Sequence, residues 1–222
     1  MKIIVAIDGF AASGKSTIAQ DLAEKTGYTH IDSGAMYRAV TLFGMQKGLV
    51  TSALNIDSKK LIELLPTINI SFDRIPCSYA TILNGKNVEK EIRSLEVSNL
   101  TPHVAKIAEV RDFLTARLRD LGKDKGIVME GRDIGTVVFP DAKMKVFVTA
   151  PLTLSVERRL EELKQQGNPA TYQSVKNDIL ERDKIDAAWT YPAKDAIRIE
   201  NGSKPLTDIV QNLLSMFYRI KN

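Results

Sequence analysis

The sequence has one cysteine, no long apolar run and little excess of either charge. The single thiol, Cys77, cannot form an internal disulfide, which excludes the disulfide-stabilised secreted domains and suits a reducing cytoplasm. The longest apolar stretches, such as Ile3 to Ile7, are about a quarter of the roughly 20 residues needed to cross a bilayer. Met1-Lys2 and the apolar residues after it resemble the start of a secretion signal, but Asp8-Gly9 ends the run too early. We therefore expect a cytoplasmic protein with no membrane partner.

The charge balance excludes fewer classes of protein than the missing disulfides and apolar runs do. The 222 residues include 31 Lys+Arg and 27 Asp+Glu, a net charge of +4, and 44% are hydrophobic, which argues against disorder and for a buried core. A mildly basic chain is compatible with nucleic acid, a membrane surface, small phosphates or a surplus of solvated lysine. The blocks of like charge that mark a nucleic-acid tail are absent from the sequence, so we expect no nucleic-acid partner.

Short apolar runs alternate with helical patterns along most of the chain. The predicted strands are Lys2 to Ile7, Tyr28 to Ile31, Gly126 to Met129, Lys145 to Thr149 and Ala196 to Ile199. The predicted helices are a first one that ends at Gly27, then Met36 to Phe43, Val104 to Leu121, Leu154 to Gln165, Val175 to Asp186 and Leu206 to Ile220. This alternation predicts an α/β fold with a doubly wound, parallel, five-stranded sheet.

Two stretches break the alternation. Short strands at Thr67 to Phe72 and Tyr79 to Leu83, with a hairpin turn at Asn84-Gly85, predict a small antiparallel insertion, preceded by a helix that Asp57 caps. Gln166 to Thr171 contains a glycine and a proline between two polar helices, which is typical of a mobile loop.

A phosphate-binding motif lies between the first strand and the first helix. Residues 9–16, GFAASGKS, match G-x-x-x-x-G-K-[ST] in the strand-to-helix context that this pattern requires, which disfavours a chance glycine turn. The glycines let backbone N–H groups point at phosphate oxygens, and the helix N-terminus adds its positive end. Lys15 is expected to reach the terminal phosphates and the Ser16 hydroxyl to ligate Mg²⁺. The predicted triphosphate-binding residues are Gly9, Phe10, Ala11, Ala12, Ser13, Gly14, Lys15, Ser16 and Thr17.

The phosphate loop alone does not separate a GTPase, an ATP-driven machine and a small-molecule kinase. The N-K-x-D motif with which GTPases read the base is absent from the sequence. Arg38 follows the second predicted strand and Arg132 follows the third, at the carboxyl edge of the sheet where open α/β folds bind ligands. Two guanidinium groups near one triphosphate indicate a second anionic ligand, as phosphoryl transfer between two nucleotides requires. For either arginine alone, a surface ion pair is the simpler explanation.

Five segments together resemble the bacterial cytidylate (CMP/dCMP) kinases, in order and at matching separation. They are Ile7 to Gly9, Ala11 to Thr17, Asp32 to Arg38, Glu91 to Arg93 and Gly131 to Asp141, and the resemblance covers nearly the whole chain. It implies transfer of the γ-phosphoryl group of ATP to CMP or dCMP by a cytoplasmic enzyme, and we expect this enzyme to be a monomer that uses the Mg²⁺ predicted from the phosphate loop. It also implies a core at about 1–36, 96–157 and 173–222, a monophosphate-binding insertion at about 37–95, and a lid at about 158–172.

The same resemblance implies the roles of individual residues. The residues that match the acceptor site are Ser33, Tyr37, Arg38, Arg111, Arg132, Asp133, Arg182 and Asp186, and those that match the catalytic positions are Lys15, Arg132, Arg158 and Arg159. A carboxylate at Asp133 suits cytosine, because it accepts from the exocyclic amine, whereas uracil would present a second acceptor.

Several assignments stay open. Tyr37 is equally explained as a core residue, Arg182 and Asp186 as members of helix-surface salt bridges, and one of Arg158 and Arg159 as an ordinary surface charge. Glu130 either orients a metal-bound water or is structural, whereas for His30, His103 and Cys77 a structural role is favoured.

Two positions depart from the family pattern. Trp189 stands in a shortened stretch where the family has a second ligand-facing arginine, and Phe10 replaces a proline. The change at Trp189 leaves open a kinase for another acceptor, and a nucleotide-binding regulator without catalytic activity also remains open.

Overall fold

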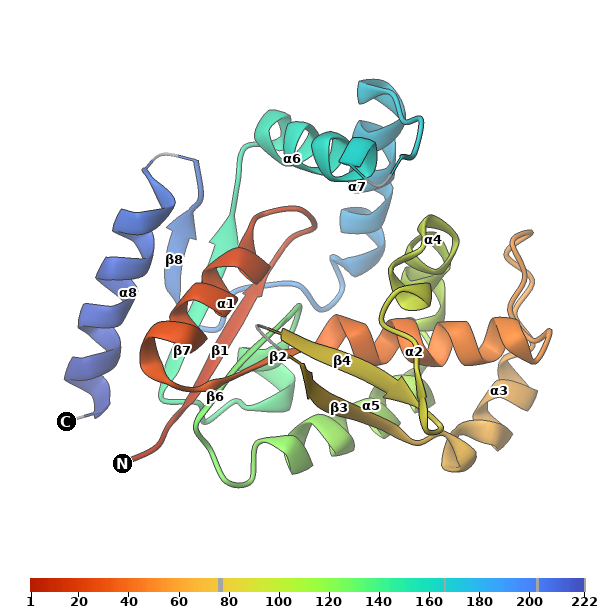
Figure 1. The fold of residues 1–222 in the computed structure, drawn as a ribbon, viewed down its shortest axis with the longest axis horizontal. Coiled ribbons are helices and arrows are strands. Elements are labelled where there is room, and N and C mark those ends of the chain that lie inside the picture. The colour runs from red at the N-terminus through yellow and green to blue at the C-terminus, as the bar shows by residue number, and fades with distance from the viewer. Residues whose placement is uncertain (76–77, 166, 203, 222) are drawn as a thin grey trace. The chain divides into compact units, whose positions relative to one another are not determined.

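The computed structural model describes residues 1–75, 78–165, 167–202 and 204–221 (Figure 1). The chain divides into two compact units, a first unit of Met1–Asp32 with Arg119–Asn222 and a second unit of Ser33–Leu118. Within the described chain, none of the helices combines the length and apolar character that a membrane crossing requires. The predictions for Cys77 and Gln166 lie outside the described residues.

The first unit is built on a five-stranded parallel sheet of order β2-β6-β1-β7-β8. Its strands are β1 (Ile4–Gly9), β2 (Thr29–Asp32), β6 (Ile127–Gly131), β7 (Met144–Thr149) and β8 (Ile197–Glu200). Each strand lies within two residues of its predicted position, so the doubly wound parallel fold is confirmed. The sequence order reverses around β1, and this switch point is where open α/β sheets bind ligands.

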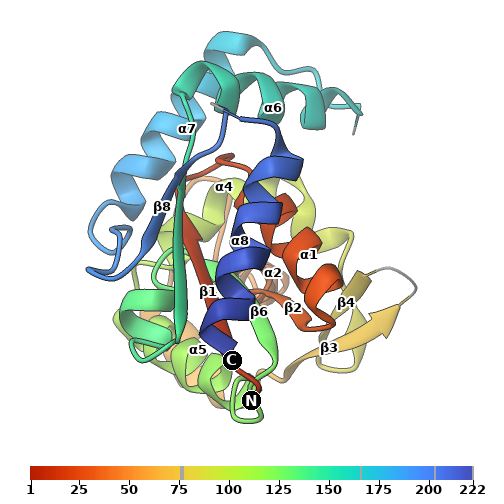
Figure 2. The same cartoon turned by 90° about the vertical axis from the view of Figure 1, so that its left-hand side faces the viewer.

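Two helices, α1 (Lys15–Thr26) and α8 (Leu206–Lys221), cover one face of this sheet together. Figure 2 shows them side by side in front of the strands. Phe217 of α8 is fully buried and makes an edge-to-face contact with Tyr28, with ring centroids 5.1 Å apart. Gly27 ends α1 in a left-handed conformation (φ 68°), as predicted. Burial of each large apolar side chain in this layer stabilises the fold by about 1.5–3 kcal/mol.

The first unit also contains the helices that follow β6 and β7. A single π-helical turn, η3 (Ile134–Val138), follows β6, and α6 (Leu152–Gln165) follows β7. The next helix, α7 (Tyr172–Asp186), begins with a capping box at Thr171. A cluster of buried apolar side chains joins α6, α7 and Ala11 of the phosphate loop, so both helices pack on that loop.

The second unit is one continuous segment that joins helices to a small antiparallel sheet. Its elements are α2 (Ser33–Gln46), α3 (Ser58–Leu64), η1 (Leu65–Thr67), β3 (Ile70–Ile75), β4 (Ser78–Leu83), β5 (Lys86–Asn87), η2 (Glu91–Arg93), α4 (Leu95–Val104) and α5 (Ala108–Leu121), whose last residues belong to the first unit. The strand order is β3-β4-β5, and Asn84 and Gly85, both with positive φ, form the turn between β4 and β5. Asp57 caps α3, because its Oδ1 accepts the N–H of Lys60 at 3.1 Å. Both predictions are confirmed.

The prediction of one helix from Val104 to Leu121 is wrong. Val104 ends α4, and α5 begins only at Ala108. Val104 lies on the buried face of α4, together with Val97 and Leu100. Its apolar side chain happens to extend the apolar spacing of the next helix, and the prediction therefore began one helix too early. The strand predicted from Thr67 also begins later, at Ile70, because Thr67 is in a 3₁₀ turn that contains Pro66.

Candidate active site

The phosphate loop connects the central strand β1 to α1 in a tightly constrained backbone. Ala12 and Gly14 adopt left-handed conformations, with φ of 52° and 82°. A side chain at Gly9 would overlap the carbonyl oxygen of Val148 in β7, so only glycine fits there. Gly14 caps α1 without a side chain, which leaves the N–H groups of the first helical turn for a ligand. The hydroxyl of Ser13 is buried and has no hydrogen-bond partner in the described part of the chain.

Lys15 is folded back onto this loop. Its ammonium donates to the carbonyl oxygen of Phe10 at 3.1 Å, and the residue is 9% exposed. Burial, together with the neighbouring Arg132 guanidinium, lowers the pKa of Lys15 from 10.5 to about 7, although Glu130 opposes this shift. The side chain is therefore close to losing its charge until an anion arrives.

Ser16, at the first turn of α1, is hydrogen-bonded to Glu130 at the end of β6. The distance from Ser16 Oγ to Glu130 Oε2 is 2.6 Å, and the hydroxyl donates its hydrogen because an ionised carboxylate only accepts. The lone pairs of the Ser16 oxygen then remain for a cation, and a hard oxygen ligand of this kind fits Mg²⁺. Among the described residues no group of three or more His, Cys, Asp or Glu side chains could hold a metal. Mg²⁺ commonly takes one or two protein oxygens and completes its shell with water and substrate phosphates, so the residues present fit it.

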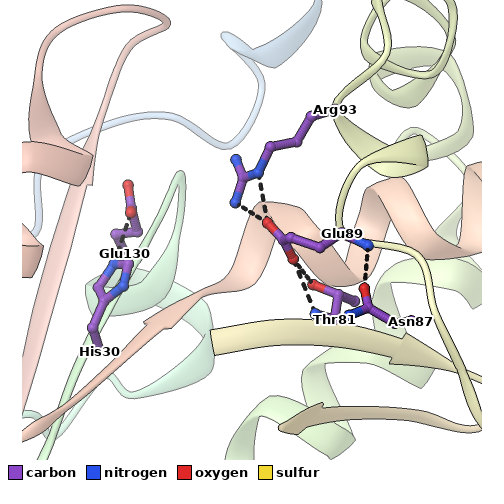
Figure 3. A network of polar contacts seen from close by, with 6 residues as sticks. All are labelled: His30, Thr81, Asn87, Glu89, Arg93 and Glu130. Carbon is purple, nitrogen blue, oxygen red and sulfur yellow. Dashed lines mark hydrogen bonds and ion pairs between the residues drawn. The ribbon is translucent and has the colours of Figure 1, made fainter. Parts of the chain in front are cut away.

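The other carboxylate oxygen of Glu130 faces His30 of β2. Glu130 Oε1 lies 2.9 Å from His30 Nε2, and Glu130 is only 2% exposed (Figure 3). His30, Glu130 and Ser16 thus form one continuous hydrogen-bonded chain.

Asp8, the residue before the phosphate loop, holds the turn that follows Asp133. Its two carboxylate oxygens accept the N–H groups of Ile134 and Gly135, each at 2.7 Å. Burial raises the pKa of Asp8 from 3.8 to about 6, despite these two hydrogen bonds. Asp133 is 5% exposed, and its carbonyl oxygen accepts the N–H of Val137 at 2.8 Å. The backbone that follows the Asp133 side chain is therefore fixed.

Arg132, in the segment that follows β6, forms an ion pair with the last residue of α7. Arg132 Nε lies 2.9 Å from Asp186 Oδ2, and Arg182 Nε lies 3.9 Å from the same oxygen. Asp186 is 5% exposed and the Arg132 side chain 17%, so this pair is largely shielded, whereas Arg182, 31% exposed and four residues before Asp186, forms an ion pair along α7. One turn before it on α7, Asp183 Oδ1 accepts the N–H of Ala11 at 3.1 Å, and burial raises the pKa of Asp183. The Asp183 carboxylate is thus hydrogen-bonded to one of the backbone N–H donors of the phosphate loop.

The structure distinguishes the two arginines of α6. Arg159 Nη1 lies 2.8 Å from Glu162 Oε2, an ion pair along the helix. Arg158 Nη1 lies 3.5 Å from the carbonyl oxygen of Ser13, and its Nη2 lies 3.3 Å from Asn201 Oδ1. Asn201 also donates to the Ser13 carbonyl at 2.9 Å. Arg158, rather than Arg159, is therefore the arginine in contact with the phosphate loop.

The second unit carries four of the predicted acceptor-site residues. Ser33 begins α2 and is 4% exposed, and Tyr37 and Arg38 are one turn further along that helix. The guanidinium of Arg111, from α5, lies 6.0 Å from the centre of the Tyr37 ring, at the limit of a cation–π contact.

The motif Glu91 to Arg93 is fixed by Glu89. Arg93 Nε donates to Glu89 Oε1 at 2.6 Å, and Thr81 donates to Glu89 Oε2 through its N–H at 2.9 Å and its hydroxyl at 2.6 Å (Figure 3). This network ties η2 to β4 within the second unit.

Three residues of the site were not predicted from the sequence to belong to it: His30, Asp183 and Asn201. Asp183 lies between Arg182 and Asp186, and Asn201 directly follows β8 at the ligand edge of the sheet, so their positions carried some signal. His30 was taken as structural, and only the pairing of β2 with β6 brings it to Glu130. After α7, the N–H of Trp189 donates to the carbonyl oxygen of Asp186 at 3.1 Å.

Comparisons with known proteins agree in assigning a family. The sequence model of the cytidylate kinase family matches residues 5–219. The chain is 46% identical over 213 residues to a cytidylate kinase of Phocaeicola vulgatus, which covers 93% of each chain. It is 45% identical over 225 residues to a cytidylate kinase of Parabacteroides distasonis, which covers 98% of this chain and 97% of that one.

Solved structures support the fold. A shikimate kinase of Bacteroides thetaiotaomicron has a TM-score of 0.51 and 10% identity, covering 98% of this chain and 99% of that one. A protein of Eubacterium ventriosum has a TM-score of 0.53 and 14% identity, covering 97% and 98%. By the match of its sequence from residue 5 to residue 219, the chain belongs to the cytidylate kinase family.

Proposed function

We propose that the protein transfers the γ-phosphoryl group of ATP to CMP or dCMP and releases ADP with CDP or dCDP. Membership of the cytidylate kinase family supports the reaction. The observation that carries the proposal is the hydrogen-bonding of Asp8 to the turn after Asp133. Asp8 directly precedes the phosphate loop, so the chain that leads into the triphosphate-binding loop is hydrogen-bonded to the turn that follows the proposed base-reading carboxylate.

The donor site is the phosphate loop, residues 9–17. Its N–H groups and the N-terminus of α1 bind the phosphates of ATP, and Lys15 leaves the Phe10 carbonyl to pair with the terminal phosphates. Mg²⁺, held by Ser16 and the phosphates, supplies charge neutralisation when bound. Arg158 neutralises charge that develops during the transfer, and the ion pair of Arg159 with Glu162 makes it the weaker candidate.

The acceptor is read by carboxylate and guanidinium groups. Asp133 accepts from the exocyclic amine of cytosine, and Ser33 and Arg111 complete the base contacts. Arg38 and Arg132 bind the monophosphate, with Tyr37 beside it, and Arg182 and Asp186 serve the phosphate and the sugar. The partly buried ion pair of Arg132 and Asp186 supports this assignment for the first unit, because it pre-orients both side chains.

The proposal includes the division into a core (about 1–36, 96–157 and 173–222), an acceptor-binding insertion (about 37–95) and a lid (about 158–172). Closure of the insertion and the lid excludes water, which would otherwise accept the phosphoryl group. We also propose a cytoplasmic monomer whose partners are its nucleotide substrates, without nucleic acid or membrane.

The test is acceptor-dependent release of ADP in a coupled assay. CMP or dCMP should support fast release, whereas UMP and AMP should be much slower. Substitution Asp133→Ala should lower kcat/KM for CMP about 100-fold, the cost of a buried hydrogen bond to a polar group, and leave the Kd of ATP unchanged. Asp124→Ala, at an exposed carboxylate before β6, is the matched control. Equal rates with UMP and CMP would refute the role of Asp133, and ADP release with no dependence on any of these acceptors would refute the function.

A further inference from the structure

His30 lies at the far end of a hydrogen-bonded chain that reaches the phosphate loop. Its Nε2 is 2.9 Å from Glu130 Oε1, and Glu130 Oε2 is 2.6 Å from the hydroxyl oxygen of Ser16. The side chain of His30 is 16% exposed and that of Glu130 is 2% exposed, so water competes little for the contact between these two residues. The pair is drawn in Figure 3.

The pairing of two strands produces this contact. β2 and β6 are parallel, with His30 opposite Val128 and Asp32 opposite Glu130. Side chains two residues apart on a strand share a face, so His30 and Glu130 are diagonal neighbours on one face of the sheet. Val128 packs in the same apolar layer as α1, which places this face under the helix that begins with Lys15 and Ser16.

Each contact constrains the next one. A hydroxyl that binds a cation through its lone pairs must send its hydrogen elsewhere, and Glu130 Oε2 accepts it. Glu130 can do so in a fixed direction only if its carboxylate does not rotate, and the hydrogen bond from His30 to Oε1 prevents that rotation. Partners behind a metal ligand typically change metal affinity by about 10–100-fold when they are removed.

We propose that His30 is a positioning residue for the Mg²⁺ ligand: it holds Glu130, which in turn orients the hydroxyl of Ser16. The inference rests on the proposed binding of MgATP, but it does not depend on the identity of the acceptor. It makes His30, a residue outside the phosphate-binding motif, a second determinant of the Mg²⁺ requirement beside Ser16.

Three substitutions separate positioning from packing. His30→Leu keeps much of the volume and removes the donor. His30→Gln places an amide nitrogen near the position of Nε2, whereas His30→Asn carries its donor one carbon closer to the backbone and does not reach Glu130. His103→Leu removes the other histidine of the chain, on α4, and is the matched control.

The measurement is equilibrium binding of a fluorescent ATP analogue, without acceptor, in Mg²⁺ titrations and in EDTA. His30→Leu and His30→Asn should raise the Mg²⁺ concentration for half-maximal binding about 10-fold, with binding in EDTA unchanged. His30→Gln and His103→Leu should stay within about twofold of the parent protein. In turnover, excess Mg²⁺ should restore the kcat of His30→Leu.

The outcomes are distinct. An unchanged Mg²⁺ requirement in the Leu and Asn variants, or an equal loss of binding in EDTA, overturns the inference and makes His30 structural. If the Leu variant does not fold, the comparison of Gln with Asn still decides, because both carry an amide. A shifted Mg²⁺ requirement in a protein that does not phosphorylate CMP would support the inference and refute the proposed function instead.

Discussion

Removal of the Lys15 charge should stabilise the nucleotide-free protein while it destroys ATP binding. Lys15 is 9% exposed, and burial lowers its pKa from 10.5 to about 7. Substitution Lys15→Met keeps an unbranched side chain of similar length and removes the ammonium that burial penalises.

The magnitude follows from the pKa shift. The fall of the Lys15 pKa from 10.5 to about 7 corresponds to about 5 kcal/mol, which is an upper limit for the cost of holding the charged form in the folded protein. The lost hydrogen bond to the Phe10 carbonyl offsets about 1 kcal/mol of the gain. Lys15→Met should therefore raise the free energy of unfolding at pH 7 by at most about 4 kcal/mol.

The dependence on pH gives the sharper test. Below pH 7 both the folded and the unfolded states hold the Lys15 proton, so the full cost is present. Between pH 7 and 10.5 the unfolded state binds the proton and the folded state does not, so the stability of the parent protein rises by up to about 1.4 kcal/mol per pH unit. The advantage of Lys15→Met over the parent should shrink accordingly as the pH rises.

The assay is urea denaturation of the nucleotide-free proteins from pH 6.5 to 9.5 at constant ionic strength. Subtracting parent from variant removes the contribution of the titrating groups that do not interact with Lys15; Asp8 and Asp183, whose pKa values Lys15 lowers, do not cancel in this way. Lys59→Met, at an exposed lysine of α3, is the control and should show no trend. A stability difference for Lys15→Met that stays constant over this range would refute the argument.

Two further contacts of the phosphate loop lead to predictions. Asp183→Ala frees the N–H of Ala11 and removes a negative charge beside the phosphate loop. The Kd of ADP, measured in an equilibrium titration, should therefore fall about threefold to tenfold. Weaker binding of ADP would contradict the idea that the Asp183 carboxylate competes with phosphate for this N–H group. Asn201→Ala removes the donor to the Ser13 carbonyl and the acceptor for Arg158. The KM of ATP should therefore rise about tenfold in steady-state assays. An unchanged KM would show that neither contact contributes to ATP binding.

The fold could be predicted because its signals are local. Five apolar runs, the motif at residues 9–16 and the Asn84-Gly85 turn each depend on a few neighbouring residues, and all have counterparts in the structure. The break between α4 and α5 could not be predicted in this way, because Val104 continues an apolar spacing across two helices.

The predicted site residues came from motifs, and the missed residues depend on long-range pairing. His30 meets Glu130 across 100 residues, Asp183 meets Ala11 across 172, and Asn201 meets Ser13 across 188. No local pattern marks such contacts, because the register of a parallel sheet and the packing of α7 bring them together. Which residues contact CMP, and where the insertion and lid end, remain predictions.

The central position of β1 has a consequence for the synthesis of the protein. Its partners begin far along the chain, since Ile4 pairs with Ile127 and Val5 pairs with Met144. At 5–20 residues per second, a ribosome needs on the order of ten seconds to produce both partners after β1. The second unit, Ser33–Leu118, is one continuous segment that is complete before either partner strand is made. The apolar β1 therefore stays without both of its neighbouring strands until β6 and β7 have been made.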